Sequence, residues 1–407
     1  MSRFPLVSFS DCVNPAEKEE YSVVVLGSTG SIGESTLRVI RQLTPRFRVE
    51  ALCAGKQIKI LAEQIREFSP KIVCVQSEVE EDALREECHA RGIPLPEVVS
   101  GSAGLLEVAR ASEYDVMISA ILGLGGMEAT LESLARGKRV AMANKESLVV
   151  GGHLFVTLRE SAENWGELVP VDSEHSALYQ ILFSLPSRER LRLVLTASGG
   201  PFLRTPLEEL KRVTPEQAAA HPRWKMGRKI SIDSATMMNK AFELHEAYWL
   251  FGVQEGFIDV VIHPESLVHG IVEEPDGCVY MHAACADMAL PIQYALFHPR
   301  RGTMRGPSVL PGNSGATSLH FEKLDSSRFP AVELARRCLR ASGNEALVFH
   351  IANEFAVEQF EEGRILFDSI VPSVANAVEQ FSGARAHGVA ELWDQVRELR
   401  VRLEELS

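Results

Sequence analysis

The chain has 407 residues, of which 45% are hydrophobic, and it carries a formal net charge of −13. A chain of this length and apolar content buries a large core and is expected to divide into two or three domains. The acidic balance, with basic residues scattered along the chain, argues against a nucleic-acid partner. No apolar run approaches the roughly 18 residues of a membrane-spanning helix, so no membrane partner is expected.

Residues 1–20 are predicted to form a loose N-terminal extension. They hold several acidic residues and no apolar core, so they resemble neither a secretory signal nor a transit peptide. The seven cysteines form no C-x-x-C pair and are odd in number, which favours reduced thiols. We therefore expect a cytoplasmic protein.

From residue 21 to about 150, short β-branched runs alternate with amphipathic segments. This alternation predicts an α/β fold with a doubly wound, Rossmann-like parallel sheet. The expected helical segments include Lys59–Phe68 and Glu128–Arg136. The expected strands are Ser22–Leu26, Val49–Cys53, Ile72–Val75, Val116–Ser119 and Arg139–Met142.

A glycine-rich loop follows the first of these strands. The loop runs Gly27-Ser28-Thr29-Gly30-Ser31-Ile32-Gly33 and leads into a predicted helix, Glu34–Leu43. Strand, glycine turn and helix in this order favour a nucleotide-binding site, because glycines let the backbone approach a pyrophosphate at the helix N-terminus. The spacing is G-x-x-G-x-x-G and not G-x-G-x-x-G, so a simple tight turn remains an alternative.

The second strand ends in Gly55-Lys56-Gln57. An acidic residue at that end would bind a ribose 2′-hydroxyl, whereas a lysine accommodates a 2′-phosphate, so Lys56 favours NADP over NAD. Glu50 lies too early in the strand to serve. An ordinary surface lysine is the alternative interpretation of Lys56.

Two further segments concentrate carboxylates. Asp172, Ser173 and Glu174 follow an apolar strand, Leu168–Val171, and period-2 alternation would place the two carboxylates on one side. Carboxylates without cysteine or histidine partners suit a hard divalent cation such as Mg²⁺ or Mn²⁺. A solvated strand edge is the alternative for these residues taken alone.

The second segment runs from Ser234 to Glu243 and is predicted to open a helix. Asn239 and Glu243 are i,i+4 neighbours, with Lys240 beside them. A serine at a helix start with a lysine one to two turns later suits a phosphate. A metal, a phosphate and a dinucleotide loop together predict a reductase that acts on a small phosphorylated substrate.

The rest of the chain gives weaker signals. Strands and helices mix less regularly over residues 151–297, and the Gly-, Pro- and Arg-rich residues 298–323 are predicted to be a linker. Residues 324–407 are expected to form a helical bundle. Its last helix has an apolar stripe of Leu392, Val396, Leu399, Leu403 and Leu406.

Six blocks of the sequence, in order, resemble the 1-deoxy-D-xylulose 5-phosphate reductoisomerase family. They begin with the glycine loop and end with the helix of Asn239 and Lys240, so the resemblance runs from about residue 21 to the C-terminus. The blocks are Gly27–Gly33, Ala143–Leu148, Pro170–His175, Ser198–Phe202, His221–Gly227 and Ser234–Lys240.

The resemblance implies a fold, an activity and a set of site residues. The activity would be conversion of 1-deoxy-D-xylulose 5-phosphate to 2-C-methyl-D-erythritol 4-phosphate, in the non-mevalonate isoprenoid route. It would need NADPH and Mg²⁺ or Mn²⁺, with Co²⁺ as a further candidate. The domains would be an NADPH-binding domain at 21–150, a catalytic domain at 151–297 and the C-terminal helical domain, and the chain would form a homodimer.

The resemblance also assigns roles by position. Asp172, Glu174 and Glu243 would bind the metal and, with Lys145, form the catalytic group. Lys145, Ser173, Glu174, Ser198, His221, Ser234, Asn239, Lys240 and Glu243 would bind the substrate. Thr29, Gly30, Ser31, Ile32, Gly55, Lys56, Gln57, Asn144, Glu146 and Gly227 would bind NADPH. Trp224 and Met226 would belong to a mobile lid, whereas His153 and His175 are expected to be structural.

The match has two departures. Ala129 stands where the family commonly has proline, and Phe349-His350-Ile351 stands where it has Leu-Asn-Ala. Two other functions remain open: a general NADPH-dependent sugar-phosphate or semialdehyde dehydrogenase, and a catalytically silent NADP-binding sensor. The sequence also leaves open whether the carbon skeleton would rearrange by a direct shift or by fragmentation and recombination.

Overall fold

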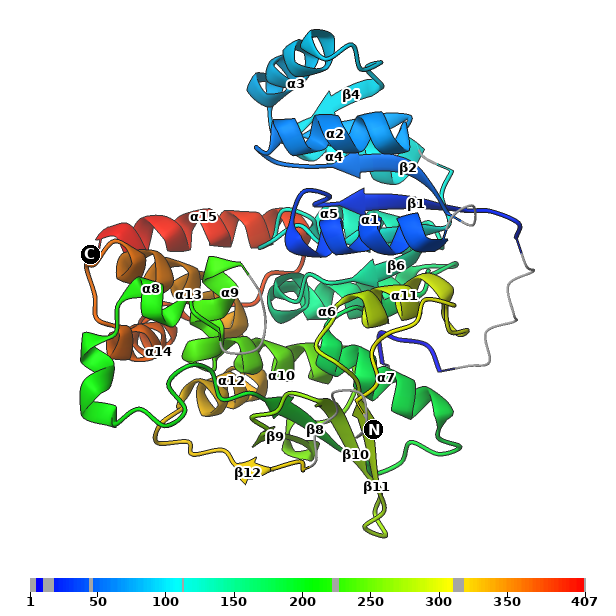
Figure 1. The fold of residues 1–407 in the computed structure, drawn as a ribbon. Helices are drawn as coiled ribbons and strands as arrows, with labels where there is room; N and C mark the ends of the chain where they lie inside the picture. The colour runs from blue at the N-terminus through cyan, green and yellow to red at the C-terminus, as the bar shows by residue number, and fades with distance from the viewer. Residues whose placement is uncertain are drawn as a thin grey trace.

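The computed structural model describes residues 5–9, 18–43, 47–111, 113–221, 227–309 and 318–405. Two sheets organise these residues, and helices cover both (Figure 1). The second sheet lies at the bottom of the view in Figure 1, and the C-terminal helices lie at the left. None of the helices in the described ranges is long and apolar enough to cross a membrane.

The first sheet has seven strands, all paired in parallel. In spatial order they are β4 (Glu97–Ser100), β3 (Ile72–Val75), β2 (Phe47–Cys53), β1 (Tyr21–Leu26), β5 (Val116–Ser119), β6 (Arg139–Met142) and β7 (Leu168–Pro170). The strand order reverses between β1 and β5, and ligands of such sheets bind outside the strand ends at this point. The predicted α/β doubly wound fold is confirmed.

Helices join the strands of this sheet. They are α1 (Ser31–Leu43), α2 (Ile58–Phe68), α3 (Glu78–Ala90), α4 (Gly101–Ala111), α5 (Met127–Ala135) and α6 (Glu146–Ser161). The five predicted strands agree with the structure to within two residues at each end. Strand β4 was missed, because it is a four-residue edge strand without a fully buried residue and therefore gives little apolar signal.

The second sheet has the order β11-β10-β8-β9-β12 and is mostly antiparallel. Its strands are β8 (Arg192–Ala197), β9 (Ile258–Ile262), β10 (Val268–Glu273), β11 (Val279–Ala283) and β12 (Glu322–Lys323). Helices α7 (Ser173–Ser184), α8 (Pro215–Ala218), α9 (Arg228–Ala235), α10 (Met238–Phe251) and α11 (Ala289–Phe297) come from the same part of the chain. Three short 3-10 helices are Leu207–Arg212, Glu255–Phe257 and Phe367–Ser369.

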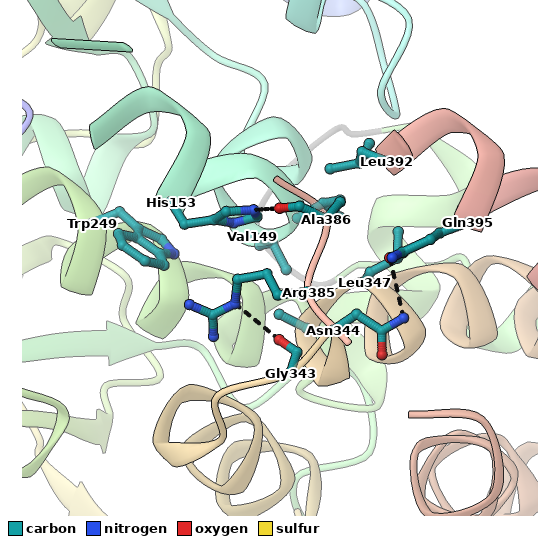
Figure 2. A pocket seen from close by; sticks show the side chains of 12 residues that line it. Val149, His153, Trp249, Gly343, Asn344, Leu347, Arg385, Ala386, Leu392 and Gln395 are labelled. Carbon is teal, nitrogen blue, oxygen red and sulfur yellow. Dashed lines mark hydrogen bonds between the residues drawn. The ribbon is translucent and has the colours of Figure 1, made fainter. Parts of the chain in front are cut away.

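The C-terminal part is helical, with α12 (Ala331–Arg340), α13 (Glu345–Glu361), α14 (Ile370–Phe381) and α15 (Val389–Glu405). Four leucine and valine positions of the predicted stripe are buried on α15, and Leu406 lies outside the described residues. Figure 2 shows where α6 meets this part: His153 Nε2 lies 2.8 Å from the carbonyl oxygen of Ala386. The structural role expected for His153 agrees with this contact.

The domain bounds themselves stay a prediction. Strand β7 belongs to the first sheet although it lies beyond residue 150, and β12 lies within the segment expected to be a linker. The part of that segment at 310–317 lies outside the described residues.

The expectation of a loose N-terminal extension is wrong for residues 5–9. Leu6 and Val7 are buried, and their backbone N–H groups donate to the carbonyl oxygens of Trp249 and Leu250 at 3.3 and 3.2 Å. These carbonyls lie in the last turn of α10, where a helix has no partners of its own. The segment is therefore held by burial of its apolar side chains and by hydrogen bonds to the free carbonyls at the end of α10.

Candidate active site

Six polar side chains from four elements meet beyond the ends of β6 and β7. Lys145 precedes α6, Asp172 precedes α7, and Glu174 lies in the first turn of α7. Asn239, Lys240 and Glu243 lie in the first two turns of α10. We call these six residues the charged cluster.

The two lysines of the charged cluster bridge its three carboxylates. Lys145 Nζ forms an ion pair with Asp172, lies 3.3 Å from Glu243 Oε1 and donates to Asn239 Oδ1 at 2.9 Å. Lys240 Nζ lies 2.7 Å from Glu174 Oε1 and pairs with Glu243 as well. Glu243 is therefore shared by both lysines and receives a third bond, from Asn239 Nδ2 at 2.6 Å.

Two local predictions around the charged cluster were wrong. Strand β7 ends at Pro170, and Asp172 and Glu174 lie at a helix start, so their proximity does not come from strand alternation. Ser234 does not open a helix: it lies in the last turn of α9, and a left-handed Met237 (φ +62°) separates α9 from α10. Such a backbone is strained for a non-glycine residue and was not visible in the apolar spacing.

Burial and charge act against each other in this cluster. Burial raises the pKa of Asp172 and of Glu174, but the ammonium groups of Lys145 and Lys240 outweigh it, and both carboxyls end below their usual range. Burial, followed by the neighbouring Glu174 carboxylate, raises the pKa of Glu243 to about 7. Burial lowers the pKa of both lysines, yet the carboxylates outweigh it and raise the two pKa values.

These residues fit a divalent cation. Asp172, Glu174 and Glu243 each offer an oxygen, and the three oxygens lie within 4.8 Å of one another. With all three carboxylates ionised, the two ammonium groups leave the cluster one net negative charge, which attracts a cation. Oxygen-only donors of this kind suit Mg²⁺ or Mn²⁺ better than soft metals.

His175 and Glu246 lie directly behind the charged cluster and are fully buried. His175 Nε2 is 2.8 Å from the backbone oxygen of Glu243, which only accepts, so Nε2 carries the proton and Nδ1 is left as an acceptor. Nδ1 lies 3.3 Å from Glu246 Oε2. Burial raises the pKa of Glu246 well above its usual value. His175 is thus structural, as expected.

Glu246 was missed by the sequence reasoning. Asp172, His175 and Glu246 also form a group whose atoms approach one another within 4.8 Å, as metal ligands would. We assign His175 a structural role, because its Nε2 hydrogen bond to the carbonyl of Glu243 fixes the orientation of the ring. The i,i+3 spacing of Glu243 and Glu246 was the signal that could have found it.

A second set of predicted residues gathers beside the end of β8. Ser198 Oγ lies 3.1 Å from His221 Nε2 and accepts from the N–H of Gly200 at 3.2 Å. A Cβ on Gly200 would lie 2.9 Å from the backbone oxygen of Ser234, so this loop and the end of α9 are in contact. Trp224 and Met226, expected in the lid, lie outside the described residues.

Ser173 lies apart from this second set. Its hydroxyl donates to Glu174, so Ser173 faces the charged cluster.

The glycine loop lies at the switch point of the first sheet. Gly27 has φ +81°, and a Cβ there would lie 2.5 Å from the backbone oxygen of Ala120, just after β5. A Cβ on Gly33 would lie 2.2 Å from the oxygen of Gly27, so only glycine lets α1 approach the loop. Gly30 has no such contact below 3.4 Å. Gly27 and Gly33 therefore determine the shape of the loop, whereas the backbone at Gly30 has space beside it.

The other predicted cofactor residues surround this loop. Gly55, Lys56 and Gln57 are exposed after β2, and Gln57 Nε2 donates to the backbone oxygen of Thr29 at 3.3 Å. Ser31 and Ile32 open α1. Glu50 is buried in β2 and pairs with Lys71 at 2.5 Å, in agreement with its exclusion as a ribose ligand.

Three further cofactor predictions come from other parts of the chain. The Asn144 amide donates to the carbonyls of Ile121 and Gly123 and accepts from the N–H of Ser147, so its side chain is used within the protein. Glu146 follows at the start of α6, and Gly227 precedes α9. The ligand roles of all these residues stay a prediction.

The first sheet, with its glycine loop at the switch point, belongs to the doubly wound α/β proteins that bind dinucleotides. The charged cluster adds a cation site of carboxylate oxygens next to it. Together they define a dinucleotide-dependent enzyme fold with a metal site.

Comparison with known proteins assigns the family. The model of 1-deoxy-D-xylulose 5-phosphate reductoisomerase matches residues 23–152, and two models of that enzyme's C-terminal domain match residues 168–251 and 284–402. A 1-deoxy-D-xylulose 5-phosphate reductoisomerase of Solibacter usitatus is 43% identical over 95% of this chain and 97% of its own length. One of Thermomicrobium roseum is 46% identical over 89% and 91%.

Solved structures agree with the sequence matches. A crystal structure of DOX-P reductoisomerase in complex with NADPH, fosmidomycin and magnesium superposes with a TM-score of 0.85, at 33% identity, over 95% of this chain and 98% of that one. The Zymomonas mobilis enzyme in complex with NADPH gives 0.85 at 36% identity over 95% and 99%. The chain belongs to the 1-deoxy-D-xylulose 5-phosphate reductoisomerase family, and the predicted resemblance is confirmed.

Proposed function

We propose that this chain performs the family's reaction at the charged cluster. The reaction is the NADPH- and metal-dependent rearrangement and reduction of 1-deoxy-D-xylulose 5-phosphate to 2-C-methyl-D-erythritol 4-phosphate. The observation that carries the proposal is the convergence of oxygens from Asp172, Glu174 and Glu243 within 4.8 Å, beyond the ends of β6 and β7 and therefore at the same edge of the first sheet as the glycine loop after β1. The related enzymes solved with NADPH and magnesium support it.

The residues divide into three tasks. Asp172, Glu174 and Glu243 would hold Mg²⁺ or Mn²⁺, which supplies Lewis-acid stabilisation of an oxyanion when bound. Lys145 pairs with both Asp172 and Glu243, so it orients these carboxylates and can donate to a substrate oxygen beside them. Ser173 donates a hydrogen bond to Glu174, the third of these carboxylates.

The phosphate would bind beside the charged cluster, near Lys240. Lys240 supplies a buried positive charge, and Ser198, His221, Ser234 and Asn239 supply neutral hydrogen-bonding groups. Binding of the phosphate here would orient the substrate and support the chemical step. NADPH would lie along the glycine loop, with Lys56 at the 2′-phosphate and its hydride-donating ring toward the charged cluster.

The enzyme would act as a homodimer in the cytoplasm. Strand β11 is an edge strand on which Val279, Tyr280 and Met281 are 45%, 39% and 48% exposed. An apolar open edge of this kind is usually covered, and a second copy related by a two-fold axis would cover it. Sedimentation should give a dimer, and Met281→Lys should shift it toward a monomer; a monomeric wild-type protein would refute the pairing.

One assay separates the proposed reaction from its rivals. NADPH oxidation with 1-deoxy-D-xylulose 5-phosphate should be fast with Mg²⁺ and should be abolished by a chelator and restored by added metal. A general dehydrogenase would not need the metal, and a silent sensor would bind NADPH without turnover. Either of those results would overturn the proposal.

A further inference from the structure

The loop after β8 is held by a side chain from more than a hundred residues further along the chain. Arg328 Nη1 donates to the backbone oxygen of Phe202 at 3.0 Å and to that of Thr205 at 2.7 Å. Arg328 lies between β12 and α12, where the sequence indicated only the beginning of the helical domain. It therefore ties the C-terminal part of the chain to the segment that begins with Ser198.

This loop has few bonds of its own. Gly199 and Gly200 have φ values of +85° and +68°, so the chain leaves β8 in a conformation that cannot continue the ladder. A single turn follows, in which the N–H of Thr205 donates to Phe202 at 3.2 Å. Arg328 adds a second hydrogen bond to the Phe202 carbonyl that closes this turn, and it also binds the carbonyl of Thr205 at the end of the turn. Without the guanidinium, the turn would lose both of these backbone hydrogen bonds to the C-terminal part of the chain and would keep the exposed Arg204–Glu322 ion pair and the contact of Phe202 with Phe367.

Arg328 is itself fixed before it meets the loop. Asp325 Oδ1 accepts from the N–H of Ser327 at 2.9 Å and from that of Arg328 at 3.3 Å, which forms a tight turn. The strand before this turn is also anchored, because Glu322 of β12 pairs with Ile262 of β9, and Ile262 pairs with Ala197 at the end of β8. Arg328 and the loop that it binds are therefore both anchored to the second sheet.

The position of the 198–205 loop affects the residues that are proposed to bind the phosphate. Ser198 contacts His221, and Gly200 lies against the end of α9 at Ser234, with no space for a side chain between them. A shift of the 202–205 turn would therefore move Ser198 relative to Ser234. Three of the proposed phosphate ligands depend on this contact.

We propose that Arg328 is a positioning residue for the phosphate pocket, acting through the 198–205 loop without touching substrate. The inference rests on the proposed function, because it takes Ser198, His221 and Ser234 as phosphate ligands. It predicts that loss of the guanidinium weakens recognition of the phosphate and spares the cofactor, which binds at the other sheet.

The same loop offers a matched control. Arg204 forms an ion pair with Glu322 whose side chains are 70% and 37% exposed. Exposed pairs of this kind contribute little, and Arg204 binds no backbone carbonyl among the contacts described here. Arg204→Met removes an arginine from the same loop without removing the support of its turn.

The experiment compares Arg328→Met, Arg328→Lys and Arg204→Met with the wild type, each as the Mg²⁺-loaded enzyme. Three quantities are measured: the KM for 1-deoxy-D-xylulose 5-phosphate, the inhibition constant of inorganic phosphate, and the Kd of NADPH from its fluorescence. Arg328→Met should raise the KM for substrate and the inhibition constant of phosphate about ten-fold or more, because two hydrogen bonds from a charged group are lost. The Kd of NADPH should stay within about two-fold of the wild-type value. Lysine reaches one carbonyl and should restore part of the loss; Arg204→Met should match the wild type.

The proposal is overturned if Arg328→Met keeps the wild-type KM and phosphate inhibition, or if NADPH binding weakens by the same factor. If Arg328→Met does not fold, the proposal is tested with Arg328→Lys, by comparing its KM and phosphate inhibition, and its NADPH binding, with those of the wild type. A wild-type enzyme that binds NADPH and phosphate but does not turn over the substrate would refute the proposed function instead, and phosphate binding by the variants would still test the role of Arg328.

Discussion

The cofactor loop and the charged cluster are built by opposite means. The loop is made by backbone: its glycines allow close approach, and the predicted contacts at Gly55, Lys56 and Gln57 are exposed. The cluster is made by side chains: two lysines and three carboxylates, several of them almost fully buried, neutralise one another. Substitutions in the loop should therefore act through shape, and substitutions in the cluster through charge.

The largest effect is expected where charge is removed from the cluster. Glu243→Gln keeps an oxygen for Asn239 and Lys145 but removes a negative charge that both lysines share, so the fold should survive. We expect kcat to fall about a thousand-fold or more at ordinary Mg²⁺ concentrations. Glu362→Gln, on an exposed position, serves as the control. Near-normal turnover of Glu243→Gln would show that the three-carboxylate assignment is wrong.

Lys240→Ala should have the next largest effect. It removes the buried cation that pairs with Glu174 and Glu243, and it removes the charge proposed to bind phosphate. Both kcat and the affinity for substrate should fall, by about a hundred-fold in kcat/KM, because binding of the remote phosphate is expected to orient the reacting part of the substrate. Inorganic phosphate or sulfate should compete with substrate in the wild type and not in the variant.

Two further outcomes bear on Lys240. A phosphonate inhibitor with a metal-chelating hydroxamate should lose affinity in Lys240→Ala and in Glu174→Gln. A change in KM alone, or fast turnover of an unphosphorylated substrate, would refute the phosphate clamp.

The loop should respond to shape. Gly27→Ala forces a left-handed residue and places a Cβ 2.5 Å from Ala120, so the free energy of unfolding should fall by about 2 kcal/mol or more. Gly30→Ala is the matched control, since its nearest atom lies at 3.4 Å. It should keep the stability of the wild type and weaken NADPH binding. Equal melting temperatures for Gly27→Ala and Gly30→Ala would contradict the claim that backbone contacts at Gly27 stabilise the loop.

The smallest effect is expected at Lys56, an exposed residue that acts on the cofactor alone. Lys56→Ala should raise the KM for NADPH about ten-fold and leave that for NADH nearly unchanged, because only NADPH carries the 2′-phosphate. Lys59→Ala, one turn further on the exposed side of α2, is the control. Equal losses with both cofactors would mean that Lys56 does not bind the phosphate.

Local patterns were sufficient for the first sheet apart from β4 and for much of α10. Strand runs such as Ile72–Val75 and the i,i+4 pair Asn239 and Glu243 depend on residues that are close in sequence, and both were predicted correctly. Predictions failed where distant contacts decide the local conformation. The strand was expected to carry Asp172 and Glu174, and Ser234 was expected at a helix start, but packing around Met237 and the start of α7 determined otherwise.

The sequence by itself determined the kinds of groups in the protein: a glycine loop after a buried strand, three carboxylates, two lysines and a helical C-terminus. Periodicity and turn chemistry act over a few residues, so they can be read without a fold. Only the tertiary structure decided which groups meet. Lys145 approaches Asp172 and Glu243, Glu246 lies behind His175, and Arg328 binds the 198–205 loop. Each of these contacts joins residues far apart in the chain. Their distances follow from how two sheets and their helices pack, because packing fixes contacts that no local pattern encodes.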